Sequence, residues 1–473
     1  MSFYLGIDLG TTGTKSVLFD DGGNLLGKGY KGYSLITPKE NIFEQSPEDW
    51  YSAVVETVRS AISNFDGVVD ALSVSAQGGS FVFCDVNEKG EIIALTNAIT
   101  WMDRRAELEA EEFCDKIYAI NGVKIGAGSV LSKILWFKKH KPEIFAKTKL
   151  ILSTSDYVYY KLTGKAVIDY TSAAMMGFFD SDKNAYNKEL LKLVGLNESQ
   201  LPVVLNPGDF IDNANKEFIS KVGLTKNVKV YCGLHDQFAA SLGANYFSNN
   251  DVIISTGTTW VVFARNLEKK LGKFSTRKHP DGGYGYFNSA VSSGTVLEWT
   301  KNNYNLSYDE MNKLASESVI DEKLFVYPFV SGNGSYRGDN LLTYGVEGVS
   351  FKHKKGDIFR ATMESVAFEI KQIINDFKQK GFELNNFIVT GGATRSDIWM
   401  QILSDVLGEK LYISEQVDGC CFGAYSVAKK GETNSFEKFQ FTGVVIEPNK
   451  VNNALYEKKF LAYNQNLSIK QKF

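Results

Sequence analysis

The chain has 473 residues, enough for two or three domains at roughly 150 residues each. Apolar residues make up 44% and charged residues 23% of it, a balance typical of globular proteins with more than one hydrophobic core. The 52 basic and 55 acidic residues give a net charge of −3. Fibrous and wholly disordered chains are excluded, and no cationic excess is present that would favour nucleic acid or an anionic membrane. We therefore expect a small molecule as the partner.

The N-terminal residues and the cysteines favour a cytoplasmic protein. MSFYLGIDLG has no basic stretch followed by a long apolar one, and no run of about 18 apolar residues follows. The five cysteines lack the Cys-x-x-Cys spacing of zinc sites, and their odd number does not suggest a disulfide framework. The sequence leaves the oligomeric state open, with a homodimer as one option.

The first residues predict a β-meander. Residues 3–9 and 14–20 are predicted strands joined by the turn Gly10–Gly13, and a third strand is predicted at 25–33. An amphipathic helix is predicted over 46–63, because a Ser-Pro-Glu-Asp start is followed by apolar residues at helical spacing.

Beyond the meander, strand and helix signals alternate, which predicts an α/β fold. Strands are predicted at 68–76, 81–85, 92–95, 228–232 and 387–390, and helices at 130–140, at 155–162 and from about residues 238 and 398 onward.

The sequence also contains a weak internal repeat. Ile-Asp-Leu-Gly-Thr-Thr starts at Ile7 and Ile-Ser-Thr-Gly-Thr-Thr at Ile254, and both predict a strand, a Gly-Thr-Thr turn and a second strand. Two such halves indicate a duplicated fold with one ligand held between the copies. We place the boundary in Gly243–Asn250, which gives domains of residues 1–245 and 246–473.

The first turn carries groups that bind phosphate. Its glycines let backbone N–H groups approach an anion, and the Thr hydroxyls and the ammonium group of Lys15 are further donors. Asp8 precedes the turn on the strand, where its carboxylate is suited to hold Mg²⁺ directly or through water. A Thr-rich turn without function is the alternative for so short a motif.

Three further segments combine residues suited to ligand binding. His235-Asp236-Gln237 follows a predicted strand, where α/β folds often place chemistry, although Asp236 as a helix N-cap is the alternative. Trp101–Arg105 offers an aromatic ring, a carboxylate and guanidinium groups to a polyhydroxylated ligand, or a surface turn with an ion pair. Gly391-Gly392-Ala393, between a predicted strand and helix, leaves room for the flat face of a base, or is only structural.

In this order, the segments resemble the FGGY carbohydrate kinases. The resemblance extends from residue 3 to about residue 428. It rests on GIDLGTTGTKSVLFD, EQSPEDW, SAQGG, WMDRR, SKILWF, DYVYYKLTG, DYTSAAMMGFFD, GLHDQ, STGTTW, SGNGSYRGD and TGGATRSDIWMQILSDVLG. Because this family belongs with the actin-like ATPases, the resemblance implies two ribonuclease H-like α/β domains with a nucleotide and sugar cleft between them.

The resemblance also implies a role for each matched residue. Asp236 matches the general base and Asp8 the magnesium-associated aspartate, and both are expected to be catalytic. The first phosphate loop matches Gly10, Thr11, Thr12, Gly13, Thr14 and Lys15, and the second matches Gly257, Thr258 and Thr259. Positions around the adenosine match Gly294, Gly391, Gly392, Ala393 and Ser396. Substrate positions match Gln77, Gly78, Trp101, Asp103, Arg104, Asp236 and Gln237.

The chain departs from the family in two places. After Gln77, xylulokinases continue with Met-His and glycerol kinases with Arg-Glu, whereas this chain has Gly78-Gly79. We expect these glycines to widen the pocket for an acceptor of five or more carbons rather than glycerol. Asp418-Gly419-Cys420-Cys421 replaces the family's usual Glu-Thr-Thr-Ala, which we interpret as a packing variation.

The sequence therefore predicts an ATP- and Mg²⁺-dependent kinase for a hydroxyl of a free ketose or polyol, with a pentulose such as xylulose favoured. Because the proton leaves late in phosphoryl transfer, an ordinary carboxylate ionised at neutral pH is sufficient as the base. His235 before the base resembles 6-deoxyketose kinases, while WMDRR is closer to glycerol kinases, so a 6-deoxyketose kinase is the alternative within the family. A non-catalytic, actin-like ATP-dependent sugar sensor is the alternative of another class, and it would not need Asp236.

Overall fold

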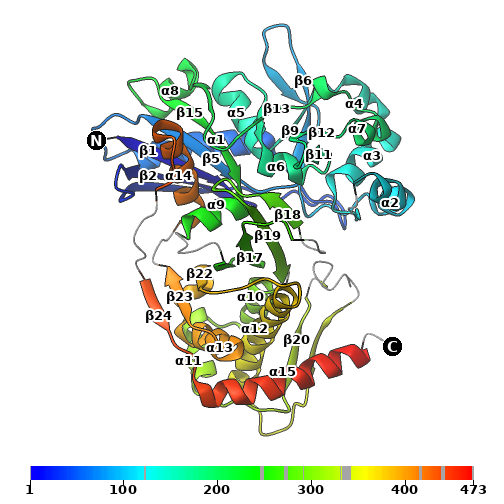
Figure 1. Cartoon of the computed structure of the whole chain (residues 1–473), viewed down its shortest axis with the longest axis vertical. Coiled ribbons are helices and arrows are strands. Elements are labelled where there is room, and N and C mark those ends of the chain that lie inside the picture. The colour runs from blue at the N-terminus through cyan, green and yellow to red at the C-terminus, as the bar shows by residue number, and fades with distance from the viewer. Residues whose placement is uncertain are drawn as a thin grey trace. The chain divides into compact units, whose positions relative to one another are not determined.

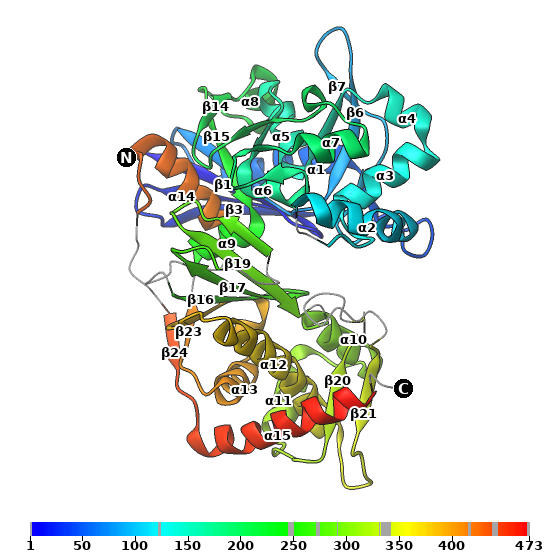
Figure 2. The same cartoon turned by 45° about the vertical axis from the view of Figure 1, so that its right-hand side comes forward.

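The structure is a computed structural model that describes residues 2–121, 124–244, 250–270, 275–290, 292–330, 332, 342–414, 418–437 and 443–470. Figures 1 and 2 show the arrangement of its helices and strands. In this described part, no helix has the length and apolar character needed to cross a membrane. The five cysteines are free thiols.

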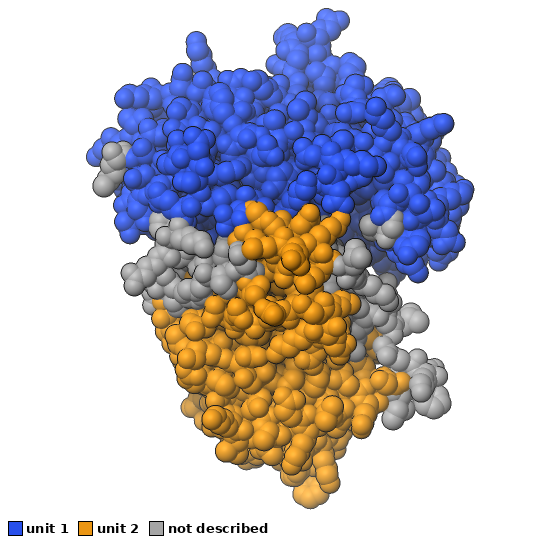
Figure 3. Space-filling view, in the orientation of Figure 1, with its two compact units in different colours: residues 1–243, 277–281, 418–438 blue, residues 244–276, 282–417, 439–473 orange. Residues whose placement is uncertain are grey.

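The chain forms two compact units, coloured in Figure 3. Unit 1 contains Met1–Gly243, Arg277–Asp281 and Asp418–Lys438, and unit 2 contains Ala244–Thr276, Gly282–Val417 and Phe439–Phe473. A single boundary near residue 245 would give two continuous segments, whereas two short segments of the C-terminal half pack within unit 1. Residues 245–249, inside the segment where we expected the boundary, lie outside the described residues.

Within the described residues of unit 1, six strands form a sheet in the order β14-β15-β5-β1-β2-β3. The meander is antiparallel, as predicted, and β5 and β15 continue the sheet in parallel to β1. The strands are β1 (Phe3–Leu9), β2 (Gly13–Asp20), β3 (Leu25–Gly32), β5 (Ala71–Ala76), β14 (Phe210–Asn213) and β15 (Lys229–His235).

Unit 2 repeats this topology. Its described residues form a seven-stranded sheet in the order β18-β19-β17-β16-β22-β23-β24. β16 and β17 form an antiparallel hairpin, and β22 and β23 continue it in parallel, as β5 and β15 do in unit 1. The predicted repeat is therefore confirmed as two copies of one ribonuclease H-like sheet. The strands are β16 (Val252–Thr256), β17 (Trp260–Asn266), β18 (Ser275–Lys278), β19 (Tyr284–Ala290), β22 (Phe387–Gly391), β23 (Leu411–Ser414) and β24 (Gly443–Ile446).

The remaining strands belong to smaller sheets in each unit. They are β4 (Glu44–Gln45), β6 (Phe81–Val86), β7 (Ile92–Ala94), β8 (Ala98–Ile99), β9 (Leu150–Ser153), β10 (Val167–Asp169), β11 (Phe179–Asp180), β12 (Ala185–Tyr186), β13 (Val203–Leu205), β20 (Phe325–Pro328) and β21 (Tyr344–Glu347).

The helices are divided between the two units. In unit 1 they are α1 (Pro47–Ala61), α2 (Glu107–Asn121), α3 (Val130–His140), α4 (Pro142–Lys147), α5 (Thr154–Thr163), α6 (Tyr170–Met175), α7 (Lys188–Val194), η1 (Glu198–Gln200), α8 (Lys216–Val222), α9 (Asp236–Gly243) and α14 (Gly419–Thr433). In unit 2 they are α10 (Gly294–Tyr304), α11 (Tyr308–Ser316), α12 (Lys355–Gln379), η2 (Gly392–Arg395), α13 (Asp397–Leu407) and α15 (Lys450–Lys470).

The alternation of side chains along β1 places two helices on opposite faces of the unit 1 sheet. Leu5 and Ile7 join the core beneath α1, together with Trp50, whose helical spacing predicted its burial. Tyr4 points to the other face and packs against Tyr425 of α14, the orange helix beside β1 in Figure 1. Asp8 lies four residues after Tyr4 on β1, and side chains an even number of residues apart lie on the same face of a strand. The Asp8 side chain therefore lies on the α14 face.

Glycine contacts explain why α14 belongs to unit 1. A Cβ on Gly6 of β1 would overlap the carbonyl oxygen of Cys421, and a Cβ on Gly423 of α14 would overlap the carbonyl oxygen of Ala239 in α9. Only residues without side chains allow backbones to come this close. These contacts join segments far apart in the sequence, which local patterns did not predict.

Candidate active site

The strand register brings the predicted site residues of unit 1 to one edge of the sheet. β1 and β15 both run parallel to β5, and Leu9 and His235 are each paired with Ala76. Gly10, Gln77 and Asp236 are the next residues along these three strands. The carboxyl ends of parallel strands therefore converge here, the usual place for a ligand in an α/β sheet.

Asp8 is a mostly buried carboxylate near the end of β1. The hydroxyl of Ser75 donates a hydrogen bond of 2.9 Å to its Oδ1 atom. Burial and then the negative charge of Asp236 raise the pKa of Asp8 to about 7, although Ser75 and Lys15 oppose this shift. Asp8 and Asp236 are thus close enough to repel one another within unit 1.

Asp236 is the first residue of α9, and β15 extends to His235, beyond the predicted end at residue 232. The Nε2 atom of His235 lies 3.2 Å from Oδ1 of Asp236. Burial raises the pKa of Asp236 to about 7, against hydrogen bonds from the backbone and side chain of Gln237. From the sequence we expected only an ordinary carboxylate, whereas burial in the structure raises the pKa of Asp236 because water has limited access to this turn.

His235 is neutral at neutral pH. Burial lowers the pKa of its imidazole to about 4, against the attraction of Asp169. Its backbone N–H donates to the hydroxyl of Thr171 over 2.9 Å, and Asp169 caps α6 through the N–H groups of Thr171 and Ser172. The DYTSAAMM segment therefore supports the end of β15 beside Asp236.

The space beside Gly78 differs from our expectation. A Cβ on Gly78 would overlap the imidazole of His235 and would lie 3.1 Å from Cγ of Met175. The expectation of a wider pocket is thus wrong at this position, because His235 fills the space that a side chain would occupy. Gly79 has φ +71°, a left-handed conformation that favours glycine.

The first Gly-Thr-Thr turn, which the sequence predicts to bind phosphate, is held by hydrogen bonds from several elements. Within the turn, the N–H of Gly10 donates to the carbonyl of Gly13 over 3.0 Å. The indole Nε1 of Trp101 donates to Oγ1 of Thr11 over 3.0 Å, which links the predicted sugar segment to the turn. Thr12 is exposed, so the tip of the turn is open to a ligand.

The next strand residues complete this turn. A Cβ on Gly13 would lie 2.6 Å from the carbonyl oxygen of Lys31 in β3, so this glycine is required by the packing of the hairpin. Thr14 is fully buried, and its side chain is therefore less open to a ligand than the Thr12 side chain. Lys15 is half exposed and forms an ion pair of 3.1 Å with Asp418.

Gln45 is a site residue that the sequence argument did not single out. Its side-chain amide donates to the carbonyl of Thr11 over 2.6 Å, and its Oε1 atom accepts from Nε2 of Gln77 over 2.9 Å. The indole N–H of Trp50 donates to the same oxygen over 3.1 Å. Gln45 therefore connects Gln77 to the first Gly-Thr-Thr turn. In the sequence, its position in the EQSPEDW segment was the feature that could have drawn attention to it.

The residues of the Trp101–Arg105 segment differ in how open they are to a ligand. Asp103 is fully buried and accepts hydrogen bonds from Nε and Nη2 of Arg105, at 2.9 and 2.8 Å. The ion pair that we considered as the alternative role of this segment is therefore present, and it joins Asp103 to Arg105. Arg104 is exposed and donates to the carbonyl of Trp101 over 3.1 Å, so Trp101 and Arg104 remain the members with surface open to a ligand.

In unit 2, the second Gly-Thr-Thr turn joins β16 to β17. A Cβ on Gly294, at the start of α10, would overlap the carbonyl oxygen of Gly257. The N–H of Thr295 also donates to the carbonyl of Thr258 over 3.0 Å. Gly294 therefore allows α10 to pack directly against the turn that contains Gly257, Thr258 and Thr259.

The two glycines at the end of β22, Gly391 and Gly392, differ in the space that is free for a side chain. Gly391 has φ +100°, and a Cβ on it would lie 2.8 Å from the carbonyl oxygen of Thr256. A Cβ on Gly392 would meet nothing closer than that same oxygen, at 3.8 Å. The N–H of Ala393 donates to Oγ1 of Thr256 over 3.2 Å. Gly391 is thus needed by the fold, whereas the space in front of Gly392 is open.

Ser396 has a structural role as the N-cap of α13. Its hydroxyl oxygen accepts from the N–H of Trp399 over 3.3 Å, and the hydroxyl donates to Asn312 over 2.8 Å. The SGNGSYRGD segment, residues 331–339, lies outside the described residues except for Gly332.

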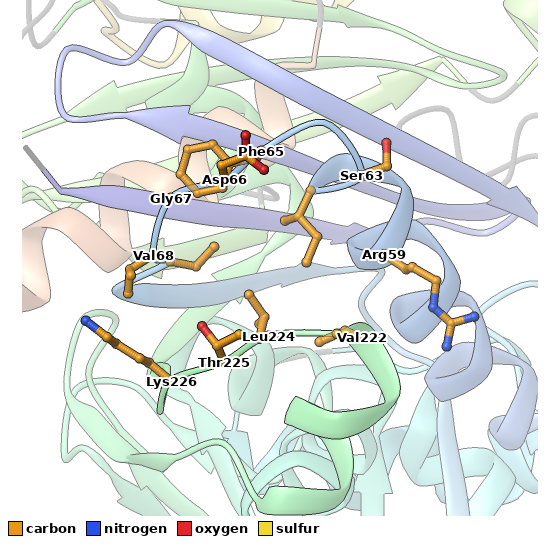
Figure 4. A pocket seen from close by; sticks show the side chains of 13 residues that line it. Arg59, Ser63, Phe65, Asp66, Gly67, Val68, Val222, Leu224, Thr225 and Lys226 are labelled. Carbon is orange, nitrogen blue, oxygen red and sulfur yellow. The ribbon is translucent and has the colours of Figure 1, made fainter.

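A hollow of about 450 Å³ in unit 1 lies away from the predicted site residues of that unit. Figure 4 shows its lining, which includes Arg59, Phe65, Val68 and Lys226. Val68 precedes β5 and Lys226 precedes β15, so the hollow lies at the amino ends of the strands. Gly10, Gln77 and Asp236 follow the opposite, carboxyl ends of the strands, and the hollow is therefore not part of the candidate site in unit 1.

Comparison with known proteins identifies the family. Residues 3–243 match the N-terminal domain, and residues 252–430 the C-terminal domain, of the FGGY family of carbohydrate kinases. The chain belongs to this family. It is therefore a sugar kinase, a phosphotransferase, as the sequence predicted.

Individual relatives of this FGGY kinase include enzymes with different acceptors. The xylulose kinase of Bacillus subtilis is 27% identical over 445 residues, which cover 91% of this chain and 88% of the relative. The gluconokinase of Bacillus licheniformis is 25% identical over 92% of this chain and 89% of the relative. A ligand-bound xylulose kinase structure from Lactobacillus acidophilus has a TM-score of 0.91 at 23% identity, covering 99% of this chain and 98% of that one, and it supports the fold.

Proposed function

We propose that this FGGY kinase transfers the γ-phosphoryl group of ATP to a hydroxyl of a free ketose, with a pentulose such as xylulose as the acceptor. The observation that carries the proposal is the convergence of Gly10, Gln77 and Asp236 at the carboxyl ends of three parallel strands. A non-catalytic sugar sensor would have no use for a carboxylate at that place. The relatives named xylulose kinase support the pentulose over other acceptors.

Asp236 acts as the general base in this proposal. Its carboxylate follows β15 directly and receives hydrogen bonds from Gln237, which help to keep it ionised. It would orient the attacking hydroxyl of the sugar and accept its proton. Because phosphoryl transfer proceeds through a loose transition state, positioning and charge neutralisation matter more than strong basicity.

The two Gly-Thr-Thr turns are the proposed phosphate-binding loops. In the first, the exposed Thr12 and the ammonium group of Lys15 would donate to phosphate oxygens. In the second, Gly257, Thr258 and Thr259 would do the same. The packing of α10 against this turn, through Gly294, supports a fixed backbone there.

The residues of unit 1 fit a magnesium ion. Mg²⁺ prefers oxygen ligands and commonly uses one or two carboxylates together with water and substrate phosphates. Asp8 and Asp236 repel one another, and both pKa values are raised to about 7, a conflict that a cation would relieve. In the described part of the chain, no three or more His, Cys, Asp or Glu side chains are grouped to hold a metal. Asp8 would therefore hold Mg²⁺ together with phosphate oxygens, and the ion would neutralise phosphate charge.

The adenosine is proposed to bind against the open side of Gly392. A Cβ there would meet no atom closer than 3.8 Å, so a flat base can approach the backbone. Ala393 lies beside it, while Gly391 and Ser396 support this turn through the contacts described above. Trp101, Arg104 and Gln77 are the proposed sugar contacts, and the buried ion pair of Asp103 with Arg105 shapes the segment rather than meeting the substrate.

An ADP-release assay with a panel of acceptors tests the proposal. The panel should contain D- and L-xylulose, another pentulose, a 6-deoxyketose, gluconate and glycerol, each with Mg-ATP. We expect a pentulose to give the highest kcat/KM. Highest activity with gluconate or a 6-deoxyketose would overturn the pentulose assignment but keep the kinase. Binding of both sugar and ATP without ADP release from any acceptor would favour the sugar sensor.

A further inference from the structure

The first turn of α14 lies against the two elements that carry the proposed chemistry. The thiol of Cys421 is 3.7 Å from the carbonyl oxygen of Lys15, and the thiol of Cys420 is 3.6 Å from the carbonyl oxygen of Asp236. The backbone of Cys421 packs so closely against Gly6 of β1 that a side chain on Gly6 would not fit. The start of α14 is therefore fixed relative to both the first phosphate turn and the base.

Asp418 stands at the N-cap position of α14 but makes no capping hydrogen bond with its side chain. Aspartate at this position usually accepts from the N–H groups of the first helical turn. Here the carboxylate instead forms the 3.1 Å ion pair with the ammonium group of Lys15, and only 11% of the Asp418 side chain is exposed. The Asp418 carboxylate thus binds the ammonium group of Lys15 and does not cap α14.

We propose that Asp418 is a positioning residue that holds the ammonium group of Lys15 at the first phosphate turn. The proposal rests on the function proposed above, in which Lys15 donates to phosphate oxygens. It assigns a role to a residue that the sequence suggested only as a packing variation. It also makes α14, which comes late in the sequence, part of the first phosphate loop.

The physical reason is the freedom of a lysine side chain. Its four-carbon stem has considerable rotamer entropy, which is lost whenever the ammonium group is held in one place. An ion pair formed before the nucleotide arrives removes this cost from the catalytic step. Because the ammonium group has three donors, Lys15 can keep its bond to Asp418 and still donate to phosphate.

Electrostatics support the same arrangement. Burial opposes the charge of Lys15, but the attraction and hydrogen bond of Asp418 outweigh it and raise the pKa of Lys15. Lys15 in turn favours the ionised form of Asp8, while the negative charge of Asp418 itself opposes that form. Asp418 therefore keeps a positive charge beside Asp8 at the phosphate turn.

A double-mutant cycle tests whether Asp418 acts through Lys15. Asp418→Asn should lower kcat by about tenfold while the KM for ATP changes less than about threefold, because positioning contributes mainly to the transition state. In a Lys15→Met background the same substitution should have no further effect on kcat. Asp418→Glu keeps the charge and should stay within about threefold of the unsubstituted enzyme.

The matched control is Glu56→Gln. Glu56 forms a 2.9 Å ion pair with Lys31 on the neighbouring strand β3, outside the proposed site. This variant should keep the kcat of the unsubstituted enzyme. Equal losses from Asp418→Asn with and without Lys15 would assign Asp418 a merely structural role and overturn the proposal, and so would an unchanged kcat in Asp418→Asn.

A second measurement uses the nucleotide-free protein and needs no activity. An amine-reactive ester at limiting time, followed by peptide mass spectrometry, gives the labelling rate of each lysine. Loss of its partner carboxylate should raise the labelling rate at Lys15 by about threefold in Asp418→Asn, because Asp418 raises the pKa of Lys15 and so lowers the fraction of neutral amine that can attack the ester. The rate at Lys31 should not change. An unchanged rate at Lys15 would contradict the proposal, whereas a raised rate in a protein that phosphorylates no acceptor would reject the kinase assignment and retain the ion pair.

Discussion

The imidazole of His235 occupies the space that a side chain at residue 78 would fill. A Cβ on Gly78 would overlap the ring, whose Nε2 atom lies 3.2 Å from the carboxylate of Asp236. The imidazole of His235 can therefore lie in this place only because residue 78 is a glycine. This relationship accounts for the glycine at residue 78, because a larger residue there would overlap the ring.

The first prediction follows from this pair. Gly78→Ala should push the imidazole away from Asp236, destabilise the protein by about 1–3 kcal/mol through overpacking, and lower kcat/KM by about tenfold or more through the displaced base. In His235→Ala/Gly78→Ala, the new methyl group has room, so the loss of stability from Gly78→Ala should largely disappear.

Thermal unfolding and steady-state kinetics check this outcome. Gly126→Ala is the control, because a Cβ there meets no atom within 4 Å, and it should change neither stability nor kcat/KM. Additive effects of Gly78→Ala and His235→Ala would show that the two positions do not compete for one space.

The second prediction concerns the base. Asp236→Asn removes the proton acceptor but keeps the size of the side chain, so kcat should fall by about 10²–10⁴-fold. ATP affinity, measured by calorimetry, should change little, because Asp236 acts on the acceptor. Near-normal turnover in this variant would remove Asp236 from the mechanism.

The sequence predicted the parts of this molecule that depend on local patterns. The Ser46 start and the spacing of Trp50 predicted α1, and the two Gly-Thr-Thr turns predicted equivalent hairpins that the structure confirms. The His-Asp-Gln motif was expected after a strand, where the structure places Asp236. Local patterns carry this information because hairpins and amphipathic helices are determined by neighbouring residues.

What the sequence could not predict depends on long-range packing. The side-chain space at Gly78 is set by His235, at the end of β15 and far away in the sequence, so the sequence wrongly suggested an open pocket there. The packing of α14 on β1 depends on Gly6, and no local pattern links that glycine to Cys421. The ion pair between Lys15 and Asp418 follows from this packing and was missed for the same reason.

The third prediction separates ligand binding from folding in the glycine pair. Gly392→Val should fold normally, because the space in front of Gly392 is open, but it should weaken ATP binding by about tenfold or more through steric overlap with the adenosine. Gly391→Val should instead destabilise unit 2, because its Cβ would lie 2.8 Å from the Thr256 carbonyl oxygen and its φ is +100°.

Calorimetric titration with Mg-ATP and thermal unfolding of both variants check this contrast. Sugar binding should survive in Gly392→Val. A folded Gly392→Val protein with unchanged ATP affinity would place the adenosine elsewhere.

The fourth prediction concerns a buried lysine beneath the Trp101 segment. Lys133 is fully buried and donates to the carbonyl of Thr100 over 2.7 Å, and burial lowers its pKa to about 7. In the unfolded chain its pKa is about 10.4. Between pH 7 and pH 10 the unfolded state therefore binds more protons, so Lys133 makes the free energy of unfolding rise with pH in this range.

Lys133→Met removes this titration. Chemical unfolding at a series of pH values from 7 to 10 should show a rise for the unsubstituted protein that is smaller in the variant. Lys139→Met is the control, because Lys139 is more than half exposed. Parallel curves for the unsubstituted and Lys133→Met proteins would show that Lys133 does not titrate in this range.

The last prediction is the pH dependence of catalysis. Burial raises the pKa of Asp236 to about 7, and burial with the charge of Asp236 raises that of Asp8 to about 7 as well. Both carboxylates must be ionised in the proposed mechanism, one to accept a proton and one to hold Mg²⁺. Activity should therefore fall as the pH decreases through about 7, and because the groups interact they titrate as a pair, with a slope between one and two protons.

The profile of kcat/KM should be measured with both substrates well below their KM values, so that the groups of the free enzyme are observed. Raising Mg-ATP to saturation should move the midpoint to lower pH, because a cation near the two carboxylates favours their ionised forms. Asp8→Asn removes the repulsion and one titrating group, so its residual activity should show a slope of one proton. A profile that stays flat down to pH 5.5 at low Mg-ATP would show that neither carboxylate has the raised pKa on which this prediction depends.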